Sequence, residues 1–331
     1  LSLASPLQYA RRAFFLNAGC AYSNDGNVDF AYVRRLAGLL DGMKRGAKIM
    51  LLAFERAYGE DGKRDDERTA FYVPDGYARE VAGEHARIFE WVCSIHPYRA
   101  DCVAALEAAK RDGARGIKWL PSAMGIDPAS PRCDHFYDAA ARLGLPIISH
   151  AGKERAVMSD YTQDYGNPLR LRRALDAGVR VVVAHCASMG EDRDLDQGES
   201  GPYVDSFSLF ARMMEEKRYE KRLYGDIAAL PQINRADYLP RLIEREDWHP
   251  RLLNGSDYPL PGVMPLFSTR KLVSMGLLQE SVAGLLREIR PHNPLLFDFV
   301  LKRHLRLGGT GATAGKALSN SIFETRRFFD A

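Results

Sequence analysis

The chain has 331 residues, of which 46% are hydrophobic and 27% charged, the composition of a folded globular protein with one large domain or two small ones. Its net charge of +3 comes from 46 basic and 43 acidic residues mixed along the sequence, so neither nucleic acid nor an anionic membrane surface is an expected partner. No apolar run approaches the roughly 20 residues that a transmembrane helix needs. The first residue is leucine, which is consistent with a fragment or a processed form.

The five cysteines show neither CxxC pairing nor dense spacing. Their odd number in a long chain favours reduced thiols over a disulfide framework, because small disulfide-stapled domains carry dense, even sets. A cytoplasmic location is therefore expected. The cysteines are Cys20, Cys93, Cys102, Cys133 and Cys186.

Before the strands begin, the segment 28–40 has the apolar spacing of a helix. Seven short apolar runs then follow, each ending in polar residues and separated from the next by a longer segment, which is the pattern of alternating strands and helices in a parallel sheet. Their starts lie about 25 to 45 residues apart, which leaves room for a helix and two loops in each interval. Right-handed crossovers place all the carboxyl ends of such strands on one side, where a barrel builds its active site. The predicted strands are Lys48–Phe54, Trp91–His96, Gly116–Leu120, Pro146–His150, Val181–His185, Leu223–Ile227 and Leu252–Asp257.

The segments between the predicted strands have the spacing of helices. Helices are predicted over 102–113, 135–144 and 169–178, and Gly113 and Gly144 are placed to end two of them. The polar stretches 58–76 and 191–206 are long and rich in turn formers, as in surface excursions or active-site lids. Neither reads as a domain boundary, so we expect a single domain over residues 1–331.

A closed (β/α)8 TIM barrel needs eight strands, and the first is missing or atypical here. It should precede Lys48, where the best candidate is the segment Ala13–Gly19. That candidate carries no histidine, and no histidine of the chain precedes His85.

An ordered set of short motifs carries a resemblance to a known family. Taken together, the set resembles the amidohydrolase superfamily, and most closely its amidohydrolase-related branch of metal-dependent hydrolases and decarboxylases. The similarity covers about residues 48–304. The motifs are HPYR (His96–Arg99), GIKWLP (Gly116–Pro121), ISHAG (Ile148–Gly152), VVAHC (Val182–Cys186), YGDI (Tyr224–Ile227), NGSDYPLP (Asn254–Pro261) and HNPLLFDF (His292–Phe299).

The resemblance implies one divalent metal ion, zinc above all, with manganese or another divalent ion as alternatives. It makes His150 a ligand, His185 a second ligand or a group that polarises the substrate, and Asp257 a ligand that also shuttles the proton of the nucleophilic water. Imidazole and carboxylate suit zinc, which lowers the pKa of bound water towards 7 when one coordination position is open. This chain departs from the family in lacking a His-x-His pair on a first strand, which leaves at most three ligands.

Four further residues are candidates for contact with the substrate. Lys118 lies in mid-strand and points either into the barrel or into the helix layer; we expect it to face the substrate or support the site rather than to bridge two metals as a carbamate. His96 either shapes the pocket or caps a loop, and Arg99 offers a fork for a substrate carboxylate. Asp226 either orients a ligand or caps a turn.

The remaining groups are given structural roles. His135, His249, His292 and His304 lie on helical or loop stretches and are predicted to be solvated surface groups. Cys186 follows His185 directly, so its side chain is predicted to point away from the barrel interior if His185 points in.

Three functions are compatible with the sequence. The first is a metal-dependent hydrolase, in which activated water attacks an amide, ester or lactone-type bond of a small molecule. The second is a non-oxidative decarboxylase of a carboxylated aromatic or muconate-like substrate on the same scaffold. The third is a catalytically silent barrel that binds a partner. A homo-oligomer is compatible with each, since the apolar segment 293–301 could pack on the barrel or on a second subunit.

Overall fold

The computed structural model describes residues 13–14, 16–21, 27–44, 46–154, 160–308 and 315–331. By its internal contacts the chain divides into two compact units, each considered by itself below. Unit 1 comprises residues 1–47, 228–250 and 254–323, and unit 2 comprises residues 48–227, 251–253 and 324–331. The expected single domain over 1–331 stays a prediction.

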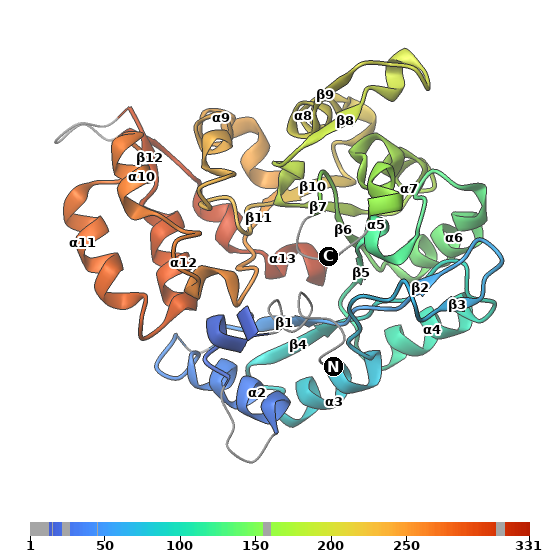
Figure 1. The fold of residues 1–331 in the computed structure, drawn as a ribbon, viewed down its shortest axis with the longest axis horizontal. Coiled ribbons are helices and arrows are strands. Elements are labelled where there is room, and N and C mark those ends of the chain that lie inside the picture. The colour runs from blue at the N-terminus through green and yellow to red at the C-terminus, as the bar shows by residue number, and fades with distance from the viewer. Residues whose placement is uncertain (1–12, 15, 22–26, 45, 155–159, 309–314) are drawn as a thin grey trace. The chain divides into compact units, whose positions relative to one another are not determined.

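Unit 2 is built on seven parallel strands that follow one another in chain order (Figure 1). Five of them form one sheet and two form another, and a parallel bridge between Cys93 and Ile117 joins the two sheets. Each strand coincides with or overlaps a predicted one, except that the second begins and ends earlier than predicted. The strands are β1 (Ile49–Leu52), β4 (Phe89–Val92), β5 (Ile117–Trp119), β6 (Ile147–His150), β7 (Val181–Ala184), β10 (Leu223–Asp226) and β11 (Leu252–Leu253).

Alternate residues of these strands form a continuous apolar cluster on the inner face of the sheet. Side chains from both edge strands, β1 and β11, reach this one cluster, so the sheet is curved as in a barrel. The helix α13 (Arg326–Asp330) completes the cluster with Phe328, which is 7% exposed. The cluster contains Val92, Ile148, Val182, Leu253 and Phe328, with Met50, Leu52, Tyr224 and Phe329 packed against it.

Helices cover the outer face of the sheet. The ring of Trp119 on β5 packs against Phe136 and Tyr137, with centroids 5.1 and 5.9 Å away. The helix that carries these two rings ends at Gly144, whose φ of 65° is the left-handed conformation predicted for a helix stop. The helices of unit 2 before α13 are α3 (Asp75–Glu84), α4 (Cys102–Arg111), α5 (Pro121–Met124), α6 (Asp134–Leu143), α7 (Arg172–Asp176) and α8 (Ser206–Glu215).

Both long polar stretches contain short antiparallel hairpins rather than irregular loops. The first pairs β2 (Ala57–Tyr58) with β3 (Arg64–Asp65), and the second pairs β8 (Glu191–Arg193) with β9 (Tyr203–Asp205).

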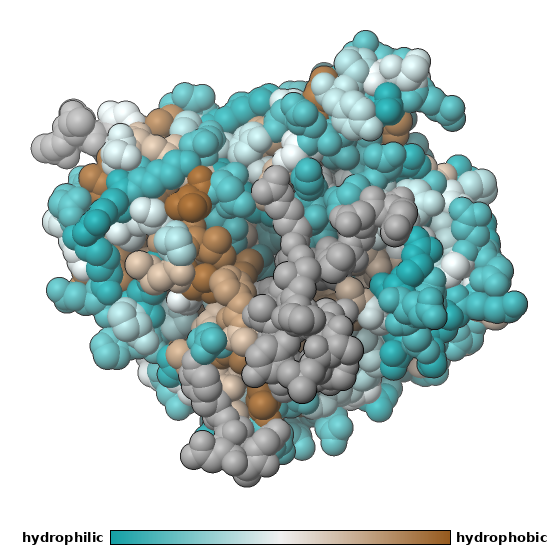
Figure 2. Space-filling view, viewed as in Figure 1, coloured by the Kyte–Doolittle hydropathy of each residue, from teal (hydrophilic) through white to brown (hydrophobic). Residues whose placement is uncertain are grey.

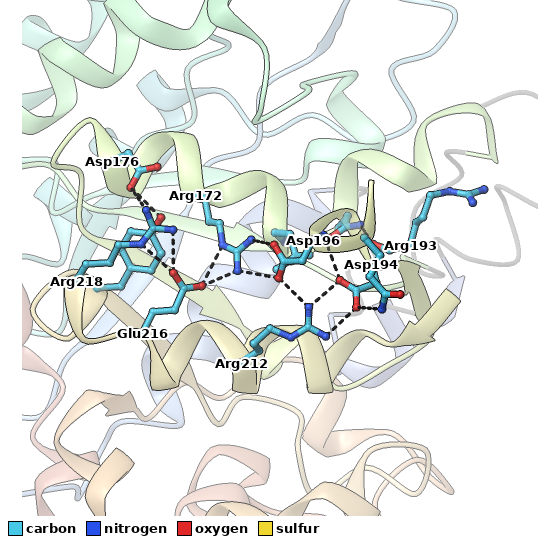
Figure 3. Close-up of polar contacts among 12 residues, drawn as sticks. Arg172, Asp176, Arg193, Asp194, Asp196, Arg212, Glu216 and Arg218 are labelled. Atoms are coloured by element: carbon cyan, nitrogen blue, oxygen red, sulfur yellow. Dashed lines mark hydrogen bonds and ion pairs between the residues drawn. The ribbon is translucent and has the colours of Figure 1, made fainter. Parts of the chain in front are cut away.

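A chain of alternating guanidinium and carboxylate groups ties the β8–β9 hairpin to two helices (Figure 3). Arg212 on α8 donates to Asp194 at 2.7 and 2.9 Å and to Asp196 at 2.7 Å. Arg172 on α7 bonds both Asp196 and Glu216. Because Arg212, Asp196 and Arg172 each have two partners of opposite sign, the hairpin is fixed to the helix layer more firmly than a single surface pair would hold it.

Unit 1 is mainly helical. Buried aromatic side chains Phe267 and Phe297 form part of its core, with Arg290 over their rings at 6.0 and 4.9 Å. The elements of unit 1 are α2 (Val28–Gly38), α9 (Leu239–Glu244), α10 (Thr269–Ser274), α11 (Glu280–Ile289), α12 (Pro294–His304), β12 (Arg306–Leu307) and β13 (Lys316–Ala317).

Figure 2 shows one face of the whole chain, in which hydrophilic side chains cover most of the surface and apolar groups a smaller area.

Two expectations are corrected. The candidate first strand Ala13–Gly19 is helical at Ala13, Phe14 and 16–18, and the described residues before Lys48 contain no strand. His249 is not a surface group but 2% exposed, with Nε2 bonded to the carbonyl of Leu242 and Nδ1 accepting from Ser319. The neighbouring Trp248 is also fully buried, so these two rings enter the core although the residues around them are polar.

In the described part of the chain, no helix combines the length and the apolar character needed to cross a bilayer. All five cysteines are free, and four of them are buried.

Candidate active site

Two histidines face each other at the carboxyl ends of neighbouring strands in unit 2. His150 is the last residue of β6 and His185 follows β7, and the register pairs His150 with Ala184. The ring centroids are 5.6 Å apart with the planes at 66°. Both residues are buried, at 5% and 8% exposure. The prediction that these two strands are parallel, with their carboxyl ends on one side, is confirmed by this pairing.

A left-handed turn places His185. His185, Cys186 and Ala187 have φ values of 56°, 51° and 51°, a conformation that residues with a side chain rarely adopt. Three such residues in succession cost a few kcal/mol at roughly 1–2 kcal/mol each, and the surrounding contacts must offset that strain. The thiol of Cys186 donates to the carbonyl of Asp226, away from the two imidazoles.

Carboxylates lie beside both imidazoles. Asp226, the last residue of β10, accepts the backbone N–H of His185 at 2.9 Å, and the same oxygen lies 3.8 Å from His185 Nδ1. His150 Nε2 lies 3.4 Å from the carboxylate of Glu154, which is 7% exposed. Carboxylates in such positions fix the orientation of an imidazole. Asp226 therefore holds the backbone of His185 at the start of its turn and lies beside its ring, so orienting a ligand and capping a turn both stay predictions.

Lys118 lies on the inner face of the sheet. It pairs in register with Ile148, whose side chain belongs to the inner cluster, and paired residues of parallel strands point to the same side. The next residue, Trp119, points the other way, into the helix layer. Lys118 is 7% exposed, so the residue is buried on the inner face.

His96 is buried among backbone groups and aromatic rings. Its Nε2 bonds the carbonyl of Met124 at 3.0 Å and its Nδ1 accepts the N–H of Tyr98 at 3.1 Å. Burial lowers the pKa of His96 to about 3, so the imidazole is neutral. Because the two ring nitrogens bond Tyr98, in the loop that follows β4, and Met124, at the end of α5, this geometry favours the loop-capping alternative.

Arg99 is held between two carboxylates. It bonds Glu55 at 2.5 Å and Asp101 through two contacts at 2.9 and 2.8 Å. These bonds raise the pKa of Arg99 above its usual value. Glu55, at 8% exposure, is placed by Ser94, whose hydroxyl accepts the N–H of Glu55 and donates to the carbonyl of Lys118. The guanidinium fork is thus already occupied by protein groups.

A small cavity lies beside Glu55. Its volume of about 10 Å³ is close to the minimum that holds one water molecule. It is lined by Phe54, Glu55, Ala57, Thr69, Ala70, Phe71, Leu120, Ala123 and Met124.

Asp257 belongs to unit 1, in the loop that follows β11. Its φ of 53° is left-handed, so it too is a strained residue at a predicted functional position. Asp257 also acts on the half-buried Tyr32: desolvation, followed by the charges of Tyr258 and Asp257, raises the pKa of Tyr32. Asp257 also raises the pKa of the buried Asp298, after the larger effect of desolvation.

The ligand types that the described part of unit 2 provides suit a divalent metal, but they are too few for a complete site. Unit 2 offers two imidazoles with a carboxylate beside each, whereas a catalytic zinc site uses three protein ligands and an open position. Within the ranges that the structure describes, no three His, Cys, Asp or Glu side chains are grouped so as to hold a metal ion. The two histidines therefore represent a partial donor set.

Three residues of these surroundings were not singled out from the sequence: Glu55, Glu154 and Tyr32. Glu154 follows His150 by four positions, which is a spacing that could have drawn attention to it. Glu55 and Tyr32 had no such signal, because their partners lie far away in the sequence.

The fold is that of a TIM-barrel protein. The structure is similar to an uncharacterized TIM-barrel protein from Bordetella bronchiseptica, with a TM-score of 0.52 and 16% identity over 88% of this chain and 91% of that one. The sequence matches the amidohydrolase family model over residues 34–269, and the chain belongs to that family. The family indicates an enzyme.

Two further solved structures are less similar. One is a probable 2-pyrone-4,6-dicarboxylic acid hydrolase from Acinetobacter baumannii with citric acid bound, at TM-score 0.48 and 13% identity over 81% of this chain and 88% of that one. The other is 5-carboxyvanillate decarboxylase from Sphingomonas paucimobilis, at TM-score 0.45 and 10% identity over 88% of this chain and 96% of that one. No curated protein matches the chain by sequence.

Proposed function

We propose that the protein is a hydrolase that cleaves an amide, ester or lactone-type bond of a small molecule. One observation carries the proposal: in a member of the amidohydrolase family, His150 and His185 face each other at adjacent strand ends. In this proposal Asp257 acts with them as general base, taking a proton from water and passing it to the leaving group. The participation of Asp257 rests on the family's sequence motif.

We propose a divalent metal, zinc first, as the cofactor, with His150, His185 and Asp257 as its ligands. When bound, such an ion lowers the pKa of coordinated water towards 7. The residues of the chain would do the rest. Asp226 holds His185 by its backbone N–H and fixes the ring, and Lys118 on the inner face supplies a positive charge for a carboxylate or a developing oxyanion.

The decarboxylase alternative relied on Arg99 as the group that binds a substrate carboxylate. Since Glu55 and Asp101 already engage that guanidinium, hydrolysis is the better supported reaction. The two reactions are separated by measuring acid release against carbon dioxide release over a panel of amides, esters, lactones and aromatic carboxylates. Carbon dioxide as the product would refute the hydrolase proposal.

Metal analysis of the purified protein tests the cofactor independently of turnover. We expect about one equivalent of divalent metal in the wild type, and its loss together with activity in His150→Ala and Asp257→Asn. The exposed His292→Ala is the matched control and should keep both. Full metal retention in both site variants would show that the site is misplaced.

A further inference from the structure

A buried ion pair in unit 1 lies next to the loop that carries Asp257. Lys302 on α12 is 1% exposed, and its ammonium group donates to Asp298 Oδ2 at 2.6 Å, one helical turn earlier. The same ammonium group donates to the carbonyl of Gly255 at 2.6 Å. Gly255 stands two residues before Asp257, so a single buried charge links the helix to the loop.

This loop needs support from outside itself. Asp257 has a left-handed backbone φ of 53°, which is unfavourable for a residue with a side chain. Within the loop, the N–H of Leu260 bonds the carbonyl of Asp257 at 3.0 Å. At the start of the loop, the N–H of Asn254 bonds the carbonyl of Ile322 at 3.0 Å. Between these two anchors, Lys302 contributes the charge-assisted bond at Gly255.

The pair is costly for a purely structural element. Desolvating two charges takes several kcal/mol for each ion, and well-packed apolar replacements are often neutral or stabilising. Asp298 Oδ1, moreover, is buried without a hydrogen-bond partner, so the pair is not fully compensated. Stability alone is therefore a poor reason for this arrangement, whereas holding the Gly255 carbonyl in one place requires a donor such as Lys302.

We propose that Lys302, held by Asp298, is a positioning residue that fixes the Gly255–Asp257 segment and so sets the orientation of the Asp257 carboxylate. The link to catalysis rests on the proposed function, in which Asp257 moves the proton. The link between Lys302 and the loop is independent of the proposed function, so the two parts can be tested separately.

The first test is hydrogen exchange of the full chain, followed by mass spectrometry of peptides covering residues 254–260. In Lys302→Met we expect exchange there to accelerate by at least about tenfold, as the loss of a hydrogen bond to a charged group would produce. The matched control is Lys271→Met, because Lys271 likewise bonds a carbonyl, that of Ile233, and a carboxylate, that of Asp237. Unchanged exchange over 254–260 in Lys302→Met would overturn the proposal.

A double variant separates positioning from packing. Lys302→Met combined with Asp298→Leu removes both charges, so thermal stability should return to near the wild-type value while the loop still exchanges fast. Restoration of slow exchange by the double variant would show that packing alone orders the loop, against the proposal. With a substrate from the panel in hand, kcat should fall about tenfold or more in both variants with KM little changed. Fast exchange with an unaltered kcat would contradict the role of Asp257 and leave the loop assignment intact.

Discussion

Gly152 lies where the loops after β6 and β7 meet, and its replacement by alanine is expected to damage the site strongly. Its φ is 79°, and an added Cβ would lie 2.6 Å from the carbonyl oxygen of Met189 and 3.2 Å from that of Ala187. Both oxygens belong to backbone, in or next to the left-handed turn that begins at His185. The methyl group can therefore be accommodated only if this turn moves.

The surroundings of Gly152 set the size of the expected destabilisation, and Gly144 provides a control. Gly144 has a φ of 65° and open space around it, so Gly144→Ala isolates the backbone strain, roughly 1–2 kcal/mol. Gly152→Ala adds an overpacking cost of about 1–3 kcal/mol and strains the bond from the Lys153 N–H to the Met189 carbonyl, 2.8 Å long. We expect a total loss of about 2–5 kcal/mol in the free energy of unfolding.

Urea unfolding followed by circular dichroism measures both variants. The loss should be at least about 1 kcal/mol greater for Gly152→Ala than for Gly144→Ala, the lower end of the overpacking cost. Metal content and turnover should fall only in Gly152→Ala, since only that change displaces the turn that places His185. Equal destabilisation by the two changes, or wild-type metal content in Gly152→Ala, would refute this reasoning.

Two further predictions concern stability. Phe328→Ala removes a ring from the inner cluster and should lower the free energy of unfolding by about 3–5 kcal/mol in a urea titration. The control is Phe30→Ala, which should lower it by less than about 1 kcal/mol because Phe30 is 59% exposed. Similar losses in the two variants would mean that Phe328 does not fill the inner cluster. His96 is neutral when folded because its pKa is lowered to about 3, so the unfolded chain binds the extra proton below about pH 6.5 and stability falls as pH decreases from there towards 3. His96→Gln should flatten this part of the stability profile and the exposed His292→Gln should not, and a profile unaffected by His96→Gln would contradict the assignment.

The strands of unit 2 were predictable because each is a short apolar run between helical segments, and their order follows from the rule for parallel connections. The positions of His150 and His185 followed from the same rule, since both stand where a strand ends. The side of the sheet that Lys118 occupies was not predictable from sequence, because it depends on the register with Ile148 and on the packing of Trp119.

Other features depended on distant partners. Arg99 looked available for a substrate, but Glu55, 44 positions away in the sequence, engages it. His249 looked like a surface group because polar residues surround it, although its own ring enters the core. The segment Ala13–Gly19 is apolar enough for a strand, and a short apolar run does not by itself distinguish strand from helix.

The position of Phe328 has a consequence for folding during synthesis. The inner cluster of unit 2 draws on β1 near residue 50, on Leu253, and on a ring more than seventy residues further along the chain. The sheet therefore cannot close its core until residues 324–331 have left the ribosome, by which time nearly all of unit 1 has already been made. Such long-range closure is slow and leaves apolar strands uncovered in the meantime. The nascent chain should accordingly depend on chaperones until α13 docks, more than a barrel whose core is complete at its eighth strand.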